Sequence, residues 1–239
     1  MLPEWQAGKV VRIEELNSFT RRFWIELPAA PVFAFRAGQF VTLDLPIHEQ
    51  RNRRWRSYSI ASPPDGSNVI ELIITLVDGG AGSTYLFNEI KEGSEITTRG
   101  PHGMFTMPED DGHDLFLICT GTGVAPFRSM VQYVYNEGLV RNGQTHLIFG
   151  CRTQAEMLYG NELMELTKAL RNFHYHPTLS REDWSGRRGY VHAIYEELCV
   201  DKQPAHFMLC GWKAMIDEAK QRILDLGYEK KQIHLELYG

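Results

Sequence analysis

A glycine-rich turn is the clearest chemical feature of this sequence. The apolar run Leu115–Thr120 leads into Gly121–Pro126 (GTGVAP), and a helical pattern follows. Such a turn lets backbone amides approach a pyrophosphate, which the N-terminus of the following helix favours electrostatically. Proline stands where the full dinucleotide pattern has its third glycine, and proline is well tolerated in a first helical turn. By itself the turn indicates either a nucleotide site or a tight strand-to-helix connection. The candidate nucleotide contacts are Gly121, Thr122, Gly123, Val124 and Pro126.

Arginines follow two other expected strands, at Arg152 and at Arg181 with the nearby Arg187. Ligands of parallel sheets bind at the carboxyl ends of the strands. No acidic residue ends the strand after the glycine turn, where a partner for an NAD ribose is expected. A guanidinium meets a phosphate with a fork of donors, so the arginines favour the 2′-phosphate of NADP(H), with NAD(H) also possible. The alternative is three solvated surface arginines. Ser180 precedes Arg181, and two further strand ends carry Cys210 with Gly211 and Glu236 with Tyr238.

The pattern of the chain changes near residue 110. Before it, short β-rich runs alternate with turns, which predicts a small antiparallel barrel or sandwich. One helix is expected there, over Ser83–Ile90, with Ser83 as its N-cap. The expected strands are Lys9–Ile13, Arg22–Leu27, Gln39–Leu45, Arg56–Ala61, Val69–Leu76 and Glu95–Arg99.

The acidic, turn-rich stretch Met107–Asp114 (MPEDDGHD) is interpreted as a linker, and strands and helices alternate after it. Repeated β–α units of this length predict a doubly wound parallel sheet. The sequence therefore predicts two domains, residues 1–110 and 111–239. The expected strands of the second are Leu115–Thr120, Thr145–Cys151, Phe173–Leu179, His206–Cys210 and Ile233–Tyr238. Its expected helices are Ala125–Asn136, Asn161–Leu170, Val191–Leu198 and Lys213–Leu226.

The bulk properties are those of an ordinary globular protein. The 239 residues carry a net charge of −5, so wholesale nucleic-acid binding is not expected. The four cysteines form no Cys-x-x-Cys pair, so neither a zinc site nor an iron–sulfur spacing is predicted, and we expect no metal. The first residues lack the pattern of a signal peptide, and no long apolar run predicts a membrane span. We expect a cytoplasmic protein, with a monomer favoured.

A second motif, Arg56-Ser57-Tyr58-Ser59, lies in the first half. By strand alternation alone it is an ordinary β-strand with a surface arginine and a core tyrosine. Together with other short motifs in the same order, however, it resembles the flavin signature of the ferredoxin–NADP reductase superfamily. Those motifs are Ala37–Phe40, Gly82–Leu86, Gly100–Phe105, Gly121–Pro126, Cys210-Gly211 and the closing Glu236–Tyr238, and they span almost the whole chain.

The resemblance implies a flavin-binding Greek-key β-barrel followed by an NAD(P)-binding α/β domain. It implies that Arg56 binds a flavin phosphate, that Tyr58 stacks on the isoalloxazine, and that Ser59 approaches flavin N5. Amides at the start of a short helix would bind the FAD pyrophosphate. The full set of implied FAD contacts is Arg56, Ser57, Tyr58, Ser59, Ile74, Gly82, Ser83, Thr84, Thr122 and Tyr238.

The implied activity is hydride exchange between NADP(H) and bound FAD, with single electrons passing to ferredoxin or flavodoxin. The implied catalytic residues are Ser59, Cys210, Glu236 and Tyr238. Tyr238 would cover the flavin until nicotinamide displaces it, although Gly239 follows where plant-like members end. The basic patch of Arg51, Arg53 and Arg54 would dock an acidic carrier, unless it is only a solvated loop or contacts the phosphates of the cofactor itself.

Three other activities stay open. The chain could be the NADH-dependent reductase component of an oxygenase system. It could be a flavin-binding electron-transfer subunit without independent turnover, although the intact glycine turn weighs against this. It could also be a reductase that releases flavin as a product, against which a pyrophosphate site for retained FAD argues.

Overall fold

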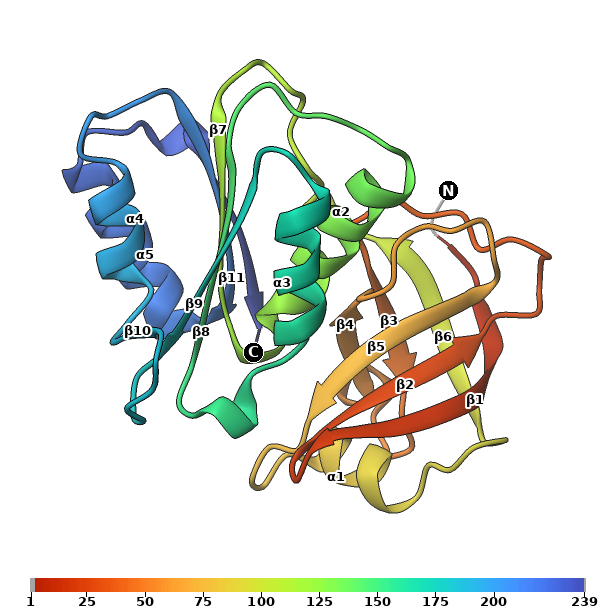
Figure 1. The fold of residues 1–239 in the computed structure, drawn as a ribbon. Helices are drawn as coiled ribbons and strands as arrows, with labels where there is room; N and C mark the ends of the chain where they lie inside the picture. Colours follow the sequence, from red (N-terminus) through yellow and green to blue (C-terminus); the bar gives the residue numbers. More distant parts are fainter. Residues whose placement is uncertain (1–2, 239) are drawn as a thin grey trace. The chain divides into compact units, whose positions relative to one another are not determined.

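The computed structural model describes residues 3–238, apart from the side chain of Tyr238, and it divides into two compact units (Figure 1). Unit 1 contains the chain up to Thr106 together with Arg128–Tyr133. Unit 2 contains Met107–Phe127 and the chain from Val134 onward. The grouping of Arg128–Tyr133 with unit 1 has no signal in the sequence. The domain boundary at residue 110 stays a prediction.

Unit 1 is built on one antiparallel sheet of six strands in the order β4-β3-β6-β1-β2-β5. The sheet closes on itself where Ile60, just after β4, bridges to Leu72 of β5. This closure selects the barrel over the sandwich, and the non-consecutive neighbours are those of Greek-key connections. The strands are β1 (Trp5–Asn17), β2 (Thr20–Glu26), β3 (Phe40–Asp44), β4 (Trp55–Ser59), β5 (Val69–Thr75) and β6 (Glu95–His102).

The helix of unit 1, α1, covers Ala81–Asn88, two residues earlier than the sequence predicts. The prediction of Ser83 as its N-cap is wrong, because Gly80 holds that position with an extended backbone. Ser83 instead lies in the first turn, where its hydroxyl donates to the Gly80 carbonyl (3.1 Å) and accepts from the Val77 amide (3.0 Å). Ser83 therefore ties the turn before α1 to the helix itself.

Unit 2 contains six parallel strands in the order β10-β9-β8-β7-β11-β12. Figure 1 shows α4 and α5 on one face of this sheet and α2 and α3 on the other, as a doubly wound fold requires. The strands are β7 (Asp114–Thr120), β8 (Thr145–Cys151), β9 (Phe173–Leu179), β10 (Arg187–Arg188), β11 (Ala205–Trp212) and β12 (Ile233–Tyr238). The helices are α2 (Val124–Asn136), α3 (Gly160–Ala169), α4 (His192–Leu198) and α5 (Lys213–Asp225).

The order of these strands creates a switch point beside β7. After β7 the chain proceeds outward through β8, β9 and β10, and it then returns to place β11 on the other side of β7. Open α/β sheets bind ligands at the carboxyl ends of the strands at such a point. The glycine turn follows β7 directly, as the 3-10 segment η2 (Gly121–Gly123). The other 3-10 segments are η1 (Arg51–Arg53), η3 (Gln154–Glu156) and η4 (Lys230–Gln232).

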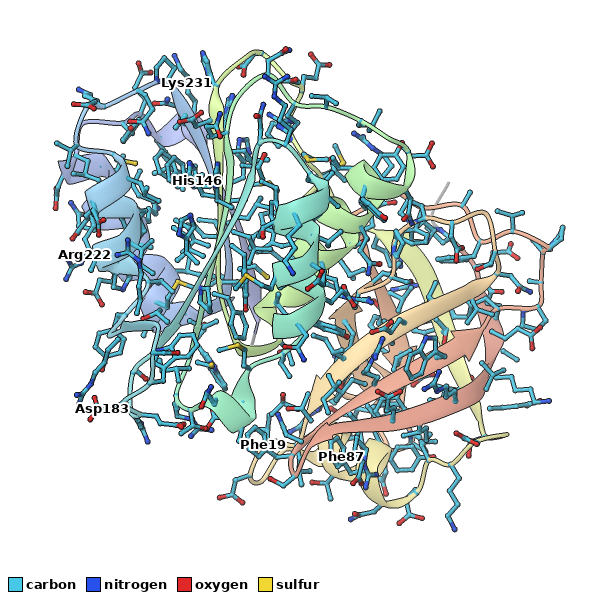
Figure 2. All side chains as sticks on the ribbon, in the orientation of Figure 1. Phe19, Phe87, His146, Asp183, Arg222 and Lys231 are labelled. Atoms are coloured by element: carbon cyan, nitrogen blue, oxygen red, sulfur yellow. The ribbon has the colours of Figure 1, made fainter. Side chains whose placement is uncertain are left out.

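A row of rings crosses the sheet of unit 2 near its amino end. Phe207, Phe116, His146 and His174 are register neighbours on four adjacent strands. Their ring centroids are 5.1, 4.9 and 5.0 Å apart along the row. His146, labelled in Figure 2, is buried and also contacts His176, with 3.1 Å between ring nitrogens. Burial is the main cause that lowers the pKa of both His146 and His176 to about 4.

No helix within residues 3–238 combines the length and the apolar character needed to cross a bilayer.

Candidate functional site

The two signature motifs of unit 1 meet where β4 lies against the first turn of α1. A Cβ atom placed on Gly82 would come within 2.9 Å of Cγ and 3.1 Å of Nε of Arg56. Arg56 donates to the carbonyls of Trp55 (2.7 Å) and Arg53 (3.1 Å). The arginine is therefore fixed by backbone contacts directly over a glycine that leaves room for it.

The first turn of α1 supplies further donors. Amides at the start of an α-helix have no carbonyl one turn earlier to bond with, and they carry the positive end of the helix dipole. The candidate residues Gly82, Ser83 and Thr84 lie in this turn, and the Thr84 amide already donates to the Gly80 carbonyl (2.9 Å). Amides of Ala81, Gly82 and Ser83, with Arg56 above them, form a place suited to an anion.

The remaining flavin candidates lie along β4 and β5. Tyr58 pairs with Val41 and packs against the core of unit 1, and its burial raises the pKa of its phenol to about 12. Tyr58 is therefore neutral at physiological pH. Ser59 is buried, and the Ser57 hydroxyl lies 3.1 Å from that of Thr42. Ile74 is buried in the barrel core, so its role as a flavin contact stays a prediction.

In unit 2 the glycine turn is pressed against the end of β11. A Cβ on Gly123 would overlap the backbone carbonyl of Cys210 and approach Cα of Gly211 to 3.1 Å. Gly121 adopts a φ of +54° and Gly211 a φ of +146°, both in the region that glycine tolerates best. Three glycines therefore let the turn and the neighbouring strand end come together. Val124 is buried at the start of α2, and Pro126 stands in its first turn.

Thr120, the last residue of β7, is a functional candidate that the sequence reasoning missed. Its Oγ1 is buried and has no hydrogen-bond partner among residues 3–238. A Cβ on Gly211 would come within 2.6 Å of this oxygen. An unpaired buried hydroxyl at a strand end costs free energy unless something binds it. The available signal was a polar residue closing an otherwise apolar strand.

Arg152 follows β8, Arg181 follows β9, and Arg187 begins the short strand β10 beside the end of β9, but the three arginines differ in their partners. Arg152 forms an ion pair with Glu156 (2.9 Å), and Arg187 forms a two-armed pair with Glu197 (2.6 and 3.0 Å). The hydrogen bonds that Arg187 donates to Glu197 raise the pKa of Arg187. The Arg181 amide donates to the Arg152 carbonyl (2.9 Å), which brings these two residues side by side.

The Arg181 guanidinium itself is exposed and makes no hydrogen bond or ion pair within the part of the chain that the structure describes. Ser180 lies next to it, with its amide donating to the Cys151 carbonyl (3.0 Å). Arg181 is thus the arginine of this edge that is available to an added phosphate.

The proposed catalytic residues of unit 2 lie on the two strands beyond the switch point. Cys210 is fully buried and is the register neighbour of Glu236, as Trp212 is of Tyr238. The strand pairing therefore brings Cys210 and Glu236 together with Gly211 beside the glycine turn. The side chain of Tyr238 lies outside the part of the chain that the structure describes. Its stacking on the flavin therefore stays a prediction.

Comparison with known proteins agrees with both units. Residues 7–107 match the family described as oxidoreductase FAD-binding domain, and residues 117–221 match the oxidoreductase NAD-binding domain. Ferredoxin–NADP reductase B of Sorangium cellulosum is 36% identical to the chain, and the match covers 97% of this chain and 96% of that protein. This chain belongs to the ferredoxin–NADP reductase superfamily.

Other relatives of this reductase include longer proteins. The phenol hydroxylase P5 protein of Acinetobacter pittii is 30% identical over all of this chain, which spans 66% of that protein. The solved ferredoxin–NADP reductase of Neisseria gonorrhoeae, with bound FAD and NADP, is 25% identical, with a TM-score of 0.82 and 98% of both chains covered. The reductase fold predicted from the sequence is therefore confirmed, and the chain is an FAD- and NAD(P)-dependent oxidoreductase.

The residues present fit both cofactors. In unit 1 the guanidinium of Arg56, packed over Gly82, and the first-turn amides of α1 suit the phosphates of FAD. In unit 2 the crowded glycine turn and the unpaired Thr120 hydroxyl suit a nucleotide at the switch point. Each unit thus has its own set of residues suited to bind one of the two cofactors.

Proposed function

We propose that this reductase uses NADP(H) in preference to NAD(H) and exchanges single electrons with a separate carrier, ferredoxin or flavodoxin. The observation that carries the NADP(H) preference is Arg181, a guanidinium with no partner within residues 3–238, at the carboxyl end of β9. A guanidinium can bind a phosphate dianion through two parallel hydrogen bonds. The neutral 2′-hydroxyl of NAD(H) can form only a weaker hydrogen bond with the guanidinium.

The carrier proposal is supported by the Sorangium relative. That protein is named ferredoxin–NADP reductase B and is 36% identical to this chain over 97% of its length. We also propose a cytoplasmic location, because the four cysteines are free thiols, and a monomer.

Bound FAD and the nicotinamide would supply the hydride and electron chemistry, so the chain's own residues bind, orient and handle protons. Arg56 and the first turn of α1 would hold the flavin phosphates, and Tyr58 would lie against the flavin ring as a neutral phenol. Ser59 would hold a proton at flavin N5. In unit 2, Gly121–Gly123 would hold the nucleotide pyrophosphate, far from the reacting carbon, so remote binding energy positions the nicotinamide.

Glu236 and Cys210 would border the nicotinamide. Glu236 would balance positive charge on that ring, and buried Cys210 would act by packing rather than as a nucleophile. The Cys119 thiol is its register neighbour on β7, and burial raises the pKa of Cys119. This environment disfavours thiolates, which agrees with a packing role for Cys210.

A second candidate function is an NADH-dependent reductase component of an oxygenase system. It is favoured by the carboxylates of Glu156 and Glu197, which hold Arg152 and Arg187 and could accept hydrogen bonds from an NAD ribose instead. The phenol hydroxylase P5 protein also matches the whole of this chain, and a glycine betaine monooxygenase reductase subunit matches 98% of it.

The test compares NADPH with NADH in steady state, with ferredoxin as the acceptor, for the wild type, Arg181→Ala and Arg171→Ala. Arg171 precedes the same strand at its amino end and serves as the matched control. We expect NADPH to be preferred and Arg181→Ala to reduce kcat/KM for NADPH by roughly tenfold while leaving NADH unchanged. Equal losses with both nucleotides, or a preference for NADH in the wild type, would support the second candidate.

A further inference from the structure

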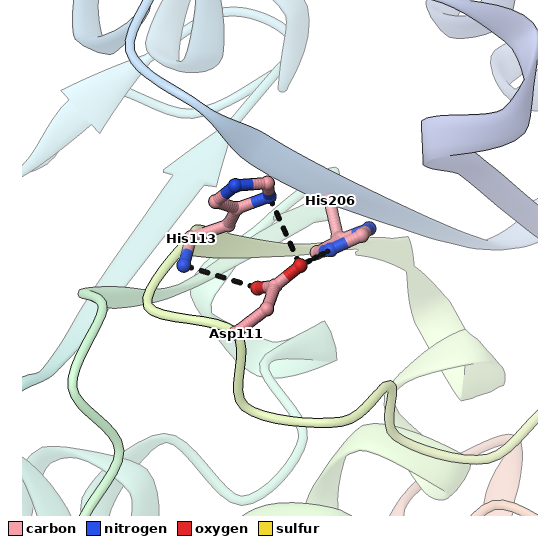
Figure 3. A group of neighbouring side chains, drawn as sticks. All are labelled: Asp111, His113 and His206. Carbon is pink, nitrogen blue, oxygen red and sulfur yellow. Dashed lines mark hydrogen bonds and ion pairs between the residues drawn. The ribbon is translucent and has the colours of Figure 1, made fainter.

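Three side chains from distant parts of the sequence converge at the amino end of the sheet in unit 2. Asp111 and His113 lie in the segment that enters β7, and His206 is the second residue of β11 (Figure 3). The strands β7 and β11 are neighbours, with Ala205 opposite Asp114. The glycine turn lies at the other end of β7, on the order of 20 Å away for a seven-residue strand.

One carboxylate oxygen stands between the two imidazoles. Asp111 Oδ2 lies 2.9 Å from Nε2 of His206 and 3.1 Å from Nδ1 of His113. The other oxygen of Asp111 accepts the His113 backbone amide (3.1 Å), and Gly112 adopts a φ of +82° between them. This tight turn directs Oδ2 toward both rings, as Figure 3 shows.

Hydrogen bonding does not account for the whole arrangement. Nδ1 of His113 is buried and has no hydrogen-bond partner among residues 3–238, although it lies within ion-pair distance of the carboxylate. Neighbouring carboxylates already have other partners: Asp110 accepts from Asn142 (2.8 Å), and Asp114 accepts the Gln144 amide (2.8 Å). The three groups thus turn their ligand atoms toward one another, all within 4.8 Å.

We propose that Asp111, His113 and His206 form a binding site for Zn²⁺. Two imidazole nitrogens and one carboxylate oxygen suit zinc, whereas Ca²⁺ and Mg²⁺ prefer oxygen ligands alone. Zinc bonds of about 2.0–2.1 Å in a tetrahedron place neighbouring ligand atoms about 3.3 Å apart. The observed separations of 2.9 and 3.1 Å between Asp111 and the two imidazoles need a few tenths of an ångström of opening, and the two imidazole nitrogens, which lie within 4.8 Å of each other, must close toward that distance.

Solvent can reach the site and supply the fourth ligand. The side chains of Asp111 and His113 are 44% and 38% exposed, whereas that of His206 is 18% exposed. A bound ion would join the segment that enters β7 to β11, and so would link these two neighbouring strands at the end remote from the nucleotide. The site is structural in this role and takes no part in the reductase reaction.

From the sequence we expected no metal site, because the cysteines are not closely spaced. Asp111 and His113 are two residues apart, but His206 is 93 residues further along. Only the parallel pairing of β7 with β11 brings the third ligand to the other two.

The test is calorimetric titration of Zn²⁺ into the FAD-loaded protein after its dialysis against a chelating resin. We expect one zinc ion per chain in the wild type. Asp111→Asn and His206→Gln each keep a hydrogen-bonding side chain of similar size, and each should weaken binding by tenfold or more. The matched controls Asp110→Asn and His174→Gln should bind zinc as the wild type does. An unchanged affinity in both ligand variants, or no binding to the wild type, would overturn the proposal.

A second measurement keeps the proposal falsifiable if a variant proves unstable. X-ray absorption at the zinc edge of the loaded wild type should report two imidazole ligands, and the thermal midpoint should rise with added Zn²⁺. Asp111→Asn alters a half-exposed side chain and should lose that rise. A spectrum without imidazole, or a midpoint that rises equally in Asp111→Asn, would contradict the site.

Discussion

The two units assemble their binding residues in different ways. In unit 1 the candidates come from one strand and one helical turn, and backbone hydrogen bonds already fix Arg56 in place. In unit 2 they come from all six strands of the sheet or the turns beside them, from Gly121 to Glu236 in the sequence. A local motif therefore identifies the first site, whereas the second depends on strand order. The lesson is that a short signature predicts a site best when one local element carries all of it.

The units also bury titratable groups differently. Unit 1 buries charge with partners: Glu71 binds Arg22 through both carboxylate oxygens (2.9 and 3.0 Å) and Arg128 at 3.1 Å. Arg128 also donates to the Ala61 carbonyl (2.8 Å). Unit 2 instead buries imidazoles whose pKa is lowered, among them His146 and His176. The stability of unit 1 should therefore fall when one partner of a buried ion pair is removed, whereas the stability of unit 2 should fall at acidic pH.

The largest effect is expected from Glu71→Gln, which leaves two arginines without their buried counter-charge. Removing one partner of a buried ion pair costs about 3–5 kcal/mol in the free energy of unfolding. Urea denaturation at neutral pH measures it. The control is Glu15→Gln, which removes a carboxylate exposed to solvent beside Arg21 and should cost less than about 1 kcal/mol. If both variants lost the same free energy of unfolding, the buried ion pairs of Glu71 would contribute no more to stability than the exposed ion pair of Glu15.

Gly123→Ala should damage the nucleotide site of unit 2 and leave the flavin site of unit 1 intact. The added methyl group overlaps the Cys210 backbone, so the turn must move away from the strand end. We expect kcat/KM for NADPH to fall on the order of 100-fold, because small displacements of a bound substrate have effects of that size. FAD content should not change.

Gly138→Asn provides the matched control for this variant. Gly138 has a φ of +61° and open space around it, and asparagine tolerates that backbone. Its activity should stay near that of the wild type. Loss of FAD from Gly123→Ala would mean that the flavin site of unit 1 and the nucleotide site of unit 2 are not independent.

Acid should destabilise the protein through the histidines of unit 2. A histidine whose pKa falls from 6.5 when unfolded to about 4 when folded binds more protons in the unfolded state between these values. The free energy of unfolding therefore falls as the pH drops from 6.5 toward 4, and we expect a loss of about 1–2 kcal/mol between pH 7 and 5 for each of the two histidines.

His146→Phe should keep the stack on Phe116 while removing one of the titrating rings, and so should flatten this pH dependence. Urea denaturation at pH 7 and pH 5 measures the difference. His48→Gln in unit 1 is the control and should leave the pH dependence as it is. If His146→Phe leaves the change in unfolding free energy between pH 7 and pH 5 unaltered, groups other than His146 cause the loss of stability in acid.

The smallest effect concerns carrier docking on unit 1. Of the three predicted arginines, Arg54 and Arg51 lie 2.8 and 3.8 Å from Asp44, so their charge is partly balanced. Arg53 is exposed and makes no ion pair within residues 3–238, which makes it the better test. Arg53→Glu should slow ferredoxin reduction several-fold at low salt and leave reduction of a small dye unchanged. Equal slowing of both acceptors would exclude docking at Arg53.

Much of the fold could be predicted from the sequence, because strand and helix periodicity is a local property. The strands Thr145–Cys151, Phe173–Leu179 and Ile233–Tyr238 have the predicted bounds. The start of α1 was misplaced, because Ser83 has the side chain of an N-cap but uses it inside the first turn. The two-residue strand β10 is too short to leave a pattern.

The partners of the site residues could not be predicted. The sequence placed Arg152, Arg181 and Arg187 at one edge, but only the structure shows that carboxylates hold the first and the third. Likewise, the unpaired hydroxyl of Thr120 and the meeting of Asp111 with His206 follow from strand pairing. Such contacts join residues far apart in the chain, and no local pattern encodes them.

The most direct test of the account is anaerobic mixing of the FAD-loaded wild type with NADPH and, separately, with NADH at the same concentration, followed by the visible absorbance of the flavin. We predict that both nucleotides bleach the flavin and that NADPH does so faster. Absence of bleaching with either nucleotide, or faster bleaching with NADH, would contradict it.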